Sequence, residues 1–140
     1  MKFKGITPNL SVKNIKETVA FYQLILGFEI KMVVLEDTHT VEDYIVDTHE
    51  YDYALVYRDE LHIMFTKENT FRENVHELEK QPLGASTLFY IEVENIDKFY
   101  TYLLQSSVNV VKELTTTWYG MREFFIKDCN GYVLAFGEQV

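Results

Sequence analysis

Apolar and polar residues alternate along two segments of the chain, residues 6–12 and 88–93. Alternation is the period of a strand with one buried face, so both segments are predicted strands. The apolar spacing then changes to three and four positions in residues 15–26 and 96–104, which predicts helices packed on one side. The hexapeptides SVKNIK and EVENID mark the two changes of period, and they place Asn14 and Asn95 where a helix N-cap is expected. The chain therefore predicts a strand–cap–helix unit that is repeated at an offset of 81 residues.

Each predicted helix is followed by β-rich segments. In the first half these cover residues 28–35, 53–59 and 60–66, and in the second half 108–114, 122–128 and 132–138. RDE and DCNG are turn compositions between the last two strands of each half. Gly27 is a natural end for the first helix. Each half is therefore predicted to have the order βαβββ, which defines an α+β fold of two tandem modules.

Two segments interrupt the repeat. Residues 36–50 are acidic and show no clear period. Residues 69–81 predict a bridging helix, capped by Asn69 or Thr70 and ended by Pro82 and Gly84. We expect a single domain over residues 1–140, with module one at about 3–67, the bridging helix at about 69–81 and module two at about 85–139.

Composition narrows the classes of partner. A net charge of −9 argues against nucleic acid and against an anionic membrane surface, and it is compatible with a cationic ligand. No apolar run reaches the roughly 20 residues of a membrane span. Cys129 is the single cysteine and stands in a turn composition, so neither an internal disulfide nor a catalytic thiol is expected. A reduced cytoplasm is the expected compartment.

Three stretches carry a resemblance to a known family: LSVKNIKETVAFYQLILGFEI (10–30), IEVENIDKFYTYL (91–103) and WYGMREFFIKDCNGYVLAF (118–136). They resemble the vicinal oxygen chelate superfamily, which includes glyoxalase I, extradiol dioxygenases, and the fosfomycin- and bleomycin-resistance proteins. The resemblance implies that each module forms a curved sheet, and that the two sheets make a cup with the helices outside.

Enzymes of this superfamily hold a divalent metal through His, Glu or Gln on the first and last strands of each module. Carried over to this chain, the four positions hold Thr7, His62, Leu88 and Ala135. Leucine and alanine have no donor atom, a neutral threonine hydroxyl is a weak ligand, and one histidine does not make a site. We therefore expect no metal, no cofactor and no catalytic residue, because no nucleophile–base pair is evident either. General acid–base work by Glu60 or Glu92 stays an alternative.

The metal-free branch of the family resembles the bleomycin-resistance proteins, which implies a ligand site at a homodimer interface. Trp118 and Tyr119 stand where that family places a ligand-facing aromatic residue, and a planar or cationic group can stack on such rings. Alternation places polar and apolar residues on the inner face of the predicted cup. The expected ligand-binding residues are Trp118, Tyr119, His62, Met64, Tyr90, Glu92, Arg122, Asn9 and Glu60. Structural alternatives are that Trp118 closes the cup and that Arg122 pairs with Glu123 or with a neighbouring strand.

The expected function is a metal-free protein that sequesters a cationic aromatic small molecule, of the antibiotic-resistance type. Two alternatives remain. One is a metal-dependent glyoxalase-like lyase or dioxygenase with a non-standard ligand set. The other is a relative that serves as a ligand sensor or partner module.

Overall fold

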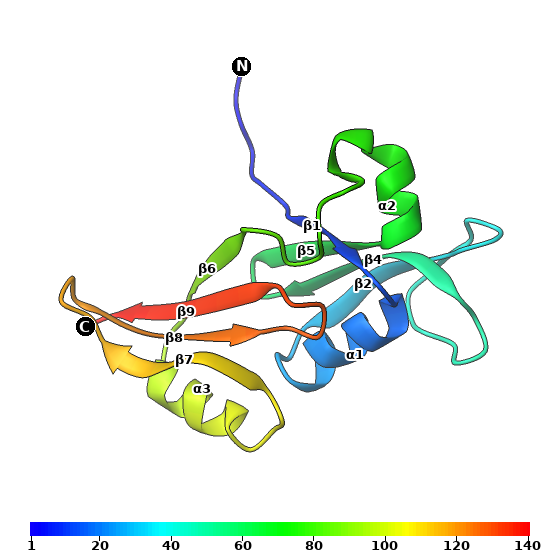
Figure 1. The fold of residues 1–140 in the computed structure, drawn as a ribbon. Helices are drawn as coiled ribbons and strands as arrows, with labels where there is room; N and C mark the ends of the chain where they lie inside the picture. The colour runs from blue at the N-terminus through cyan, green and yellow to red at the C-terminus, as the bar shows by residue number, and fades with distance from the viewer. The chain divides into compact units, whose positions relative to one another are not determined.

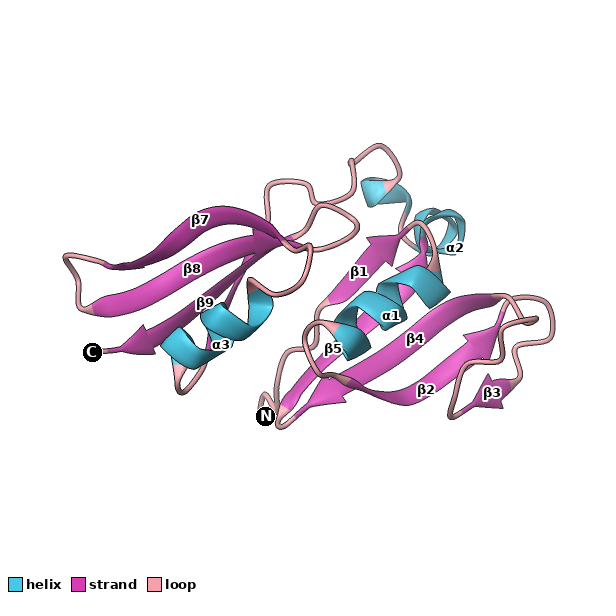
Figure 2. Cartoon of the chain, turned by 90° about the horizontal axis from the view of Figure 1, so that it is seen from below, coloured by secondary structure: helices cyan, strands magenta, loops and turns pink.

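The computed structural model describes all 140 residues and divides them into two compact units, residues 1–81 and 82–140. Each unit contains one mixed β-sheet with a helix packed along one of its faces (Figures 1 and 2). Each unit contains the predicted order of strand, helix and three long strands. The α+β class and the pair of βαβββ modules are thus confirmed, whereas a cup formed jointly by both sheets stays a prediction.

The N-terminal unit builds a five-stranded sheet. Its elements are β1 (Asn9–Val12), α1 (Ile15–Leu24), β2 (Glu29–Leu35), β3 (Val41–Glu42), β4 (Tyr51–Arg58), β5 (Leu61–Lys67), α2 (Glu68–Asn74) and the 3-10 turn η1 (His76–Leu78). The strand order is β1-β5-β4-β2-β3, with β1 parallel to β5 and the other pairs antiparallel. The first strand is shorter than predicted, because residues 6–8 are not part of it.

The C-terminal unit builds a four-stranded sheet. Its elements are β6 (Leu88–Glu92), α3 (Ile96–Leu103), β7 (Asn109–Thr116), β8 (Met121–Lys127) and β9 (Val133–Gln139). The strand order is β6-β9-β8-β7, with β6 parallel to β9 and the other pairs antiparallel. Each unit thus repeats one plan, in which the first strand pairs in parallel with the last.

Each core lies between the helix and the sheet. In the N-terminal unit the Tyr22 ring of α1 packs 4.8 Å from the Phe65 ring and 5.6 Å from the Phe28 ring, measured between centroids. In the C-terminal unit the Phe124 ring contacts Tyr100 of α3 and Phe136 of β9. Tyr22 and Tyr100 lie on the predicted apolar faces of their helices. Leu104 was expected on the same face but is exposed, because α3 ends at Leu103.

The two helices begin in different ways. The Asn14 side chain accepts a hydrogen bond of 2.9 Å from the Glu17 backbone N–H, which confirms the predicted N-cap. The cap predicted for the Asn95 side chain is wrong. Asn95 adopts a left-handed conformation with φ of 59°, and its side chain makes no cap bond. The carboxylate of Glu138 on β9 accepts from the backbone N–H groups of Asn95 and Ile96 instead, at 2.9 and 3.0 Å.

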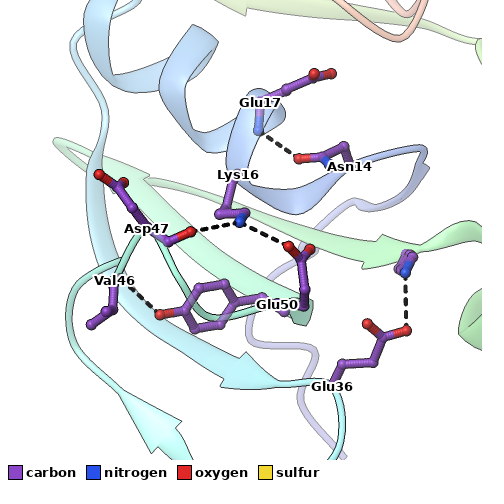
Figure 3. Close-up of polar contacts among 9 residues, drawn as sticks. Asn14, Lys16, Glu17, Glu36, Val46, Asp47 and Glu50 are labelled. Carbon is purple, nitrogen blue, oxygen red and sulfur yellow. Dashed lines mark hydrogen bonds and ion pairs between the residues drawn. The ribbon is translucent and has the colours of Figure 1, made fainter.

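The acidic segment, residues 36–50, is pinned to its own unit (Figure 3). The Lys16 ammonium on α1 donates to the Asp47 carbonyl oxygen at 3.0 Å and to the Glu50 carboxylate at 2.9 Å. The buried Tyr51 hydroxyl accepts from the Val46 N–H and donates to Glu42. The segment also adds β3, which pairs with β2 and was not predicted.

The bridging helix is shorter than predicted. It forms α2 over Glu68–Asn74 and then one 3-10 turn, and it lacks the single run over residues 69–81. The N-cap position is Lys67, with no side-chain bond, so the cap by Asn69 or Thr70 is wrong. The chain passes directly from β5 into α2, which leaves no room for a separate cap residue. No helix in the structure has the length and apolarity that a membrane span requires.

Candidate functional site

The face of the C-terminal sheet opposite α3 carries a cluster of polar and aromatic side chains. Side chains alternate along β8, and Phe124 packs toward α3, so its neighbour Glu123 projects from the opposite face. Glu123 is 0% exposed. A fully buried carboxylate is costly unless it is paired and hydrogen-bonded, so its partners define the site.

Three donors converge on the two oxygens of Glu123. The Tyr90 hydroxyl on β6 donates to Oε2 at 2.8 Å. The Lys112 ammonium on β7 donates to Oε1 at 2.9 Å. The Tyr119 hydroxyl, from the turn between β7 and β8, donates to the same oxygen. The carboxylate therefore joins two outer strands and a turn on one face of the sheet.

The network shifts the pKa values of its members in a consistent direction. Burial raises the pKa of Glu123, but hydrogen bonds from Tyr119, Lys112 and Tyr90 outweigh it and leave this pKa below the ordinary value. Burial and the bond to Glu123 raise the pKa of Tyr90 to about 12. The bond to Glu123 also raises the pKa of Tyr119. Near neutral pH the carboxylate is ionised and both tyrosines keep their protons.

Gly137 on β9 allows Tyr90 to reach the carboxylate. Gly137 is paired with Glu123 across the sheet, and the Tyr90 ring lies directly over it. A Cβ atom added at Gly137 would stand only 2.1 Å from the Tyr90 hydroxyl oxygen and 2.6 Å from its Cζ. Any side chain at this position would therefore displace the ring.

Aromatic surface stays open beside the buried carboxylate. Tyr90 is 44% exposed, Tyr119 51% and Trp118 94%. The Trp118 and Tyr119 rings meet edge to face at 5.2 Å between centroids. The turn that carries them is closed by the Gly120 N–H bonded to the Thr117 carbonyl oxygen. We call Tyr90, Trp118 and Tyr119 the aromatic platform.

Two other predicted residues of this unit, Arg122 and Glu92, are not members of the platform. Arg122 projects from the helix side of the sheet, where its guanidinium pairs with Asp97 of α3 at 2.8 Å and also donates to Thr116. Its partner is thus Asp97 and not Glu123. Glu92 is exposed at the end of β6, two positions from Tyr90, and its negative charge contributes to the raised pKa of Tyr90.

Four predicted residues belong to the N-terminal unit. Asn9 accepts a hydrogen bond of 2.9 Å from the Thr66 hydroxyl, and Met64 on β5 is half-buried. His62 is exposed, with its ring stacked 6.1 Å from the Tyr57 ring and its Nδ1 3.3 Å from the Glu60 carbonyl oxygen. Glu60 is exposed in the turn between β4 and β5. These four residues share a unit, but no bond among their side chains builds a common site.

Three members of the network were not among the predicted site residues: Glu123, Lys112 and Gly137. Alternation along β8 gave a partial signal, because it places Glu123 on the face opposite the buried Phe124. The meeting of Tyr90, Lys112 and Glu123 depends on how three separate strands align, and no local pattern encodes that register.

The chain is similar in sequence to a known protein family. A family model described as the Glyoxalase/Bleomycin resistance protein/Dioxygenase superfamily matches residues 6–136. The chain belongs to this superfamily. No curated protein matches it.

Solved structures share the fold at low sequence identity. A protein of unknown function from Agrobacterium tumefaciens str. C58 is 19% identical, with a TM-score of 0.71 over 100% of this chain and 97% of the other. A glyoxalase-related enzyme from Clostridium phytofermentans is 20% identical, with a TM-score of 0.68 over 100% and 98%. TnmS3, an antibiotic binding protein from Streptomyces sp. CB03234, is 14% identical, with a TM-score of 0.69 over 100% and 99%.

The strand register refines the metal positions that the family implies. Asn9 pairs with Met64, and Tyr90, 81 positions after Asn9, pairs with Ala135. Met64 is therefore the counterpart of Ala135, two residues beyond His62. The positions that the family implies are then Thr7 and Met64 in the N-terminal unit, and Leu88 and Ala135 in the C-terminal unit. Neither pair supplies ligands that fit a divalent metal, and no group of three or more His, Cys, Asp or Glu side chains gathers in the structure.

Proposed function

We propose that the chain captures a planar, cationic aromatic small molecule on the aromatic platform, without a metal. One observation carries the proposal: the buried carboxylate of Glu123 holds the hydroxyls of Tyr90 and Tyr119, while about half of each residue stays exposed. Rings that are already fixed lose little conformational freedom on binding, so they bind a planar partner more tightly than mobile rings do.

The pKa values of the network support binding over proton transfer. A general acid or base works best with a pKa near the working pH. The pKa of Glu123 lies below its ordinary value and that of Tyr90 lies at about 12, so neither group is poised to exchange a proton near neutrality. The description of TnmS3 as an antibiotic binding protein agrees with capture as the function.

Charge supports a cationic ligand. The net charge of −9 attracts cations from a distance and speeds their encounter with the protein. Ring faces also attract a cation at short range. The proposal includes a homodimer in the cytoplasm that binds its ligand stoichiometrically, as the resemblance to bleomycin-resistance proteins implies. Sedimentation equilibrium would return twice the monomer mass, and a monomer at every concentration would contradict the dimer.

Calorimetric titration with bleomycin and with the cationic acridine dye proflavine tests the binding function. Trp118→Ala is expected to weaken binding about fivefold, since aromatic stacking contributes roughly 1 kcal/mol. Tyr102→Ala is the matched control, because Tyr102 is an exposed aromatic residue on α3, on the other side of the sheet. The proposal fails if neither compound binds, or if both variants weaken binding equally.

Elemental analysis of the purified protein tests the metal-free part of the proposal. We expect less than one tenth of an equivalent of any divalent metal, on the order of a trace contaminant, because the four family positions lack the His and carboxylate ligands that hold such an ion. One tightly bound ion per chain would contradict this and would favour a metal-dependent lyase or dioxygenase.

A further inference from the structure

We propose that the aromatic platform selects planar ligands that carry N–H or O–H donors at the ring edge, because Glu123 turns both tyrosine hydroxyls into acceptors. The inference rests on the proposed function and names the chemistry that the site prefers. Glu123 is a positioning residue in this scheme, since it is fully buried and acts on the ligand through Tyr90 and Tyr119.

The direction of each hydrogen bond follows from counting protons. A phenolic hydroxyl has one proton and an ionised carboxylate has none, so Tyr90 and Tyr119 must both donate to Glu123. What each hydroxyl can still offer a ligand is a lone pair. The lowered pKa of Glu123 keeps the carboxylate ionised near neutral pH, which maintains this direction.

The neighbouring groups do not reverse this arrangement. The Thr117 side chain also interacts with Tyr119 and lowers its pKa, as a donor to the phenol oxygen does. The Thr117 hydroxyl donates to the Met121 carbonyl oxygen at 2.9 Å as well. Lys112 donates to Glu123, and its ammonium lies 4.8 Å from the centroid of the Phe125 ring. Thr117 therefore competes with a ligand for the Tyr119 oxygen only as far as its single proton is shared with Met121.

Charge alone does not explain selection at the platform. Lys112 neutralises Glu123 at 2.9 Å, and Glu92 is a further negative charge that acts on Tyr90. The overall charge of −9 attracts cations of every shape, and it does not distinguish between two ligands of equal charge. The direction of a hydrogen bond is a local property, so it can discriminate between two ligands of equal charge.

Two acridine dyes provide the test. Proflavine and acridine orange share one cationic tricycle, but proflavine has two amino groups with N–H donors and acridine orange has dimethylamino groups without them. Calorimetry at pH 7 is expected to show proflavine binding about 3- to 10-fold more tightly, the effect of about one net hydrogen bond. In the Tyr90→Phe/Tyr119→Phe double variant the two affinities are expected to become equal.

A second variant keeps the rings and their hydroxyls. Glu123→Gln retains the side-chain volume, but its amide can donate to one tyrosine hydroxyl and so frees that proton to point outward. The preference for proflavine is expected to fall to about twofold or less, because one of the two hydroxyls can then donate to the ligand instead of accepting from it. Circular dichroism and thermal melting check that each variant is folded.

Each outcome decides a separate point. Equal affinity of the wild type for both dyes would overturn the donor preference and leave the binding function standing. A preference that persists in the double variant would overturn it too, since the bulk of the methyl groups would then explain the difference. Failure of both dyes and of bleomycin to bind would remove the proposed function and the inference together.

Discussion

Glu123 shows how one residue can be both structurally necessary and functionally important. Its carboxylate is fully buried and accepts from Tyr90, Lys112 and Tyr119. Three donors stabilise the charged form more than burial disfavours it, so the pKa is lowered. The same bonds fix the two exposed rings, and the stability of the unit and the geometry of the platform are therefore linked.

The linkage predicts a pH-dependent loss of stability. A carboxylate with a lowered pKa in the folded state stabilises the protein above its ordinary pKa of 4.5, and the stabilisation is lost as the pH falls through the lower folded value. Glu123→Gln is expected to lower the free energy of unfolding by about 2 kcal/mol at pH 7. Urea unfolding should show a smaller difference from the wild type at pH 3. An equal difference at both pH values would contradict the role of the charge.

Gly137 predicts a spectroscopic change that involves no ligand. Gly137→Ala places a methyl group on the Tyr90 ring, so the bond from Tyr90 to Glu123 should break and the pKa of Tyr90 should fall from about 12 toward 10. Absorbance at the tyrosinate band during a pH titration measures the change, and Tyr90→Phe identifies which tyrosine is responsible. An unchanged titration curve would show that the ring adapts without losing the bond.

At the scale of single elements, the N-termini of the two helices are capped in different ways. α1 begins with a local side-chain cap from Asn14, whereas α3 receives its cap from Glu138, 42 residues after Ile96. A carboxylate at a helix N-terminus also complements the helix dipole. The second device ties the start of α3 to the last strand of its sheet, so the helix and the sheet depend on each other.

Substitutions at the caps separate the two devices. Asn14→Ala and Glu138→Ala are each expected to lower the free energy of unfolding by about 1 kcal/mol. Asn95→Gly is expected to be neutral, because glycine accepts the positive φ of 59°, while Asn95→Ala should cost about 1 kcal/mol through backbone strain. Thermal melts of the four variants measure these effects. A loss in Asn95→Gly comparable to that in Glu138→Ala would restore a capping role for the Asn95 side chain.

The types of the elements could be predicted from local periodicity. Of the two failures, one involved a contact distant in sequence and the other a weak local period. The strands and helices were predicted because alternation and helical spacing are local patterns. Asn95 looked identical to Asn14 in sequence, but it adopts a positive φ and makes no side-chain cap. A carboxylate on β9 accepts from the N–H groups of Asn95 and Ile96. The bridging helix was predicted too long, because its weak period did not reveal the break at Val75 between α2 and η1.

For the candidate site, the aromatic residues could be predicted from the sequence, but the hydrogen-bond and ion-pair partners could not. Tyr90, Trp118 and Tyr119 were expected from alternation and from the family resemblance, and the structure places two of them on one carboxylate. Arg122 was expected to contact a ligand, yet strand alternation turns it to the helix side, where it pairs with Asp97. Its neighbour Glu123 faces the opposite side of the sheet, where the platform lies. The prediction therefore selected the wrong one of two adjacent charged residues for that face.

For the whole molecule, net charge sets how fast a ligand arrives. With a charge of −9, the association rate of proflavine is expected to fall about tenfold between 20 mM and 500 mM salt, concentrations on the order of weak and strong screening. The uncharged tricycle acridone should associate at a rate that salt does not change. Stopped-flow fluorescence of Trp118, the one tryptophan, reports both reactions. Equal salt dependence for the two compounds would contradict electrostatic steering.

The close approach of Tyr90 to Gly137 has an evolutionary consequence. The corresponding pair in the N-terminal unit, by strand register, is Asn9 and Thr66. Asn9 is smaller than its counterpart Tyr90, and Thr66 is larger than its counterpart Gly137. One chain thus contains two solutions to the same volume constraint. Among descendants of this protein, a mutation that adds a side chain at position 137 should persist only after the tyrosine at position 90 has been replaced. These two positions are therefore expected to change in a fixed historical order.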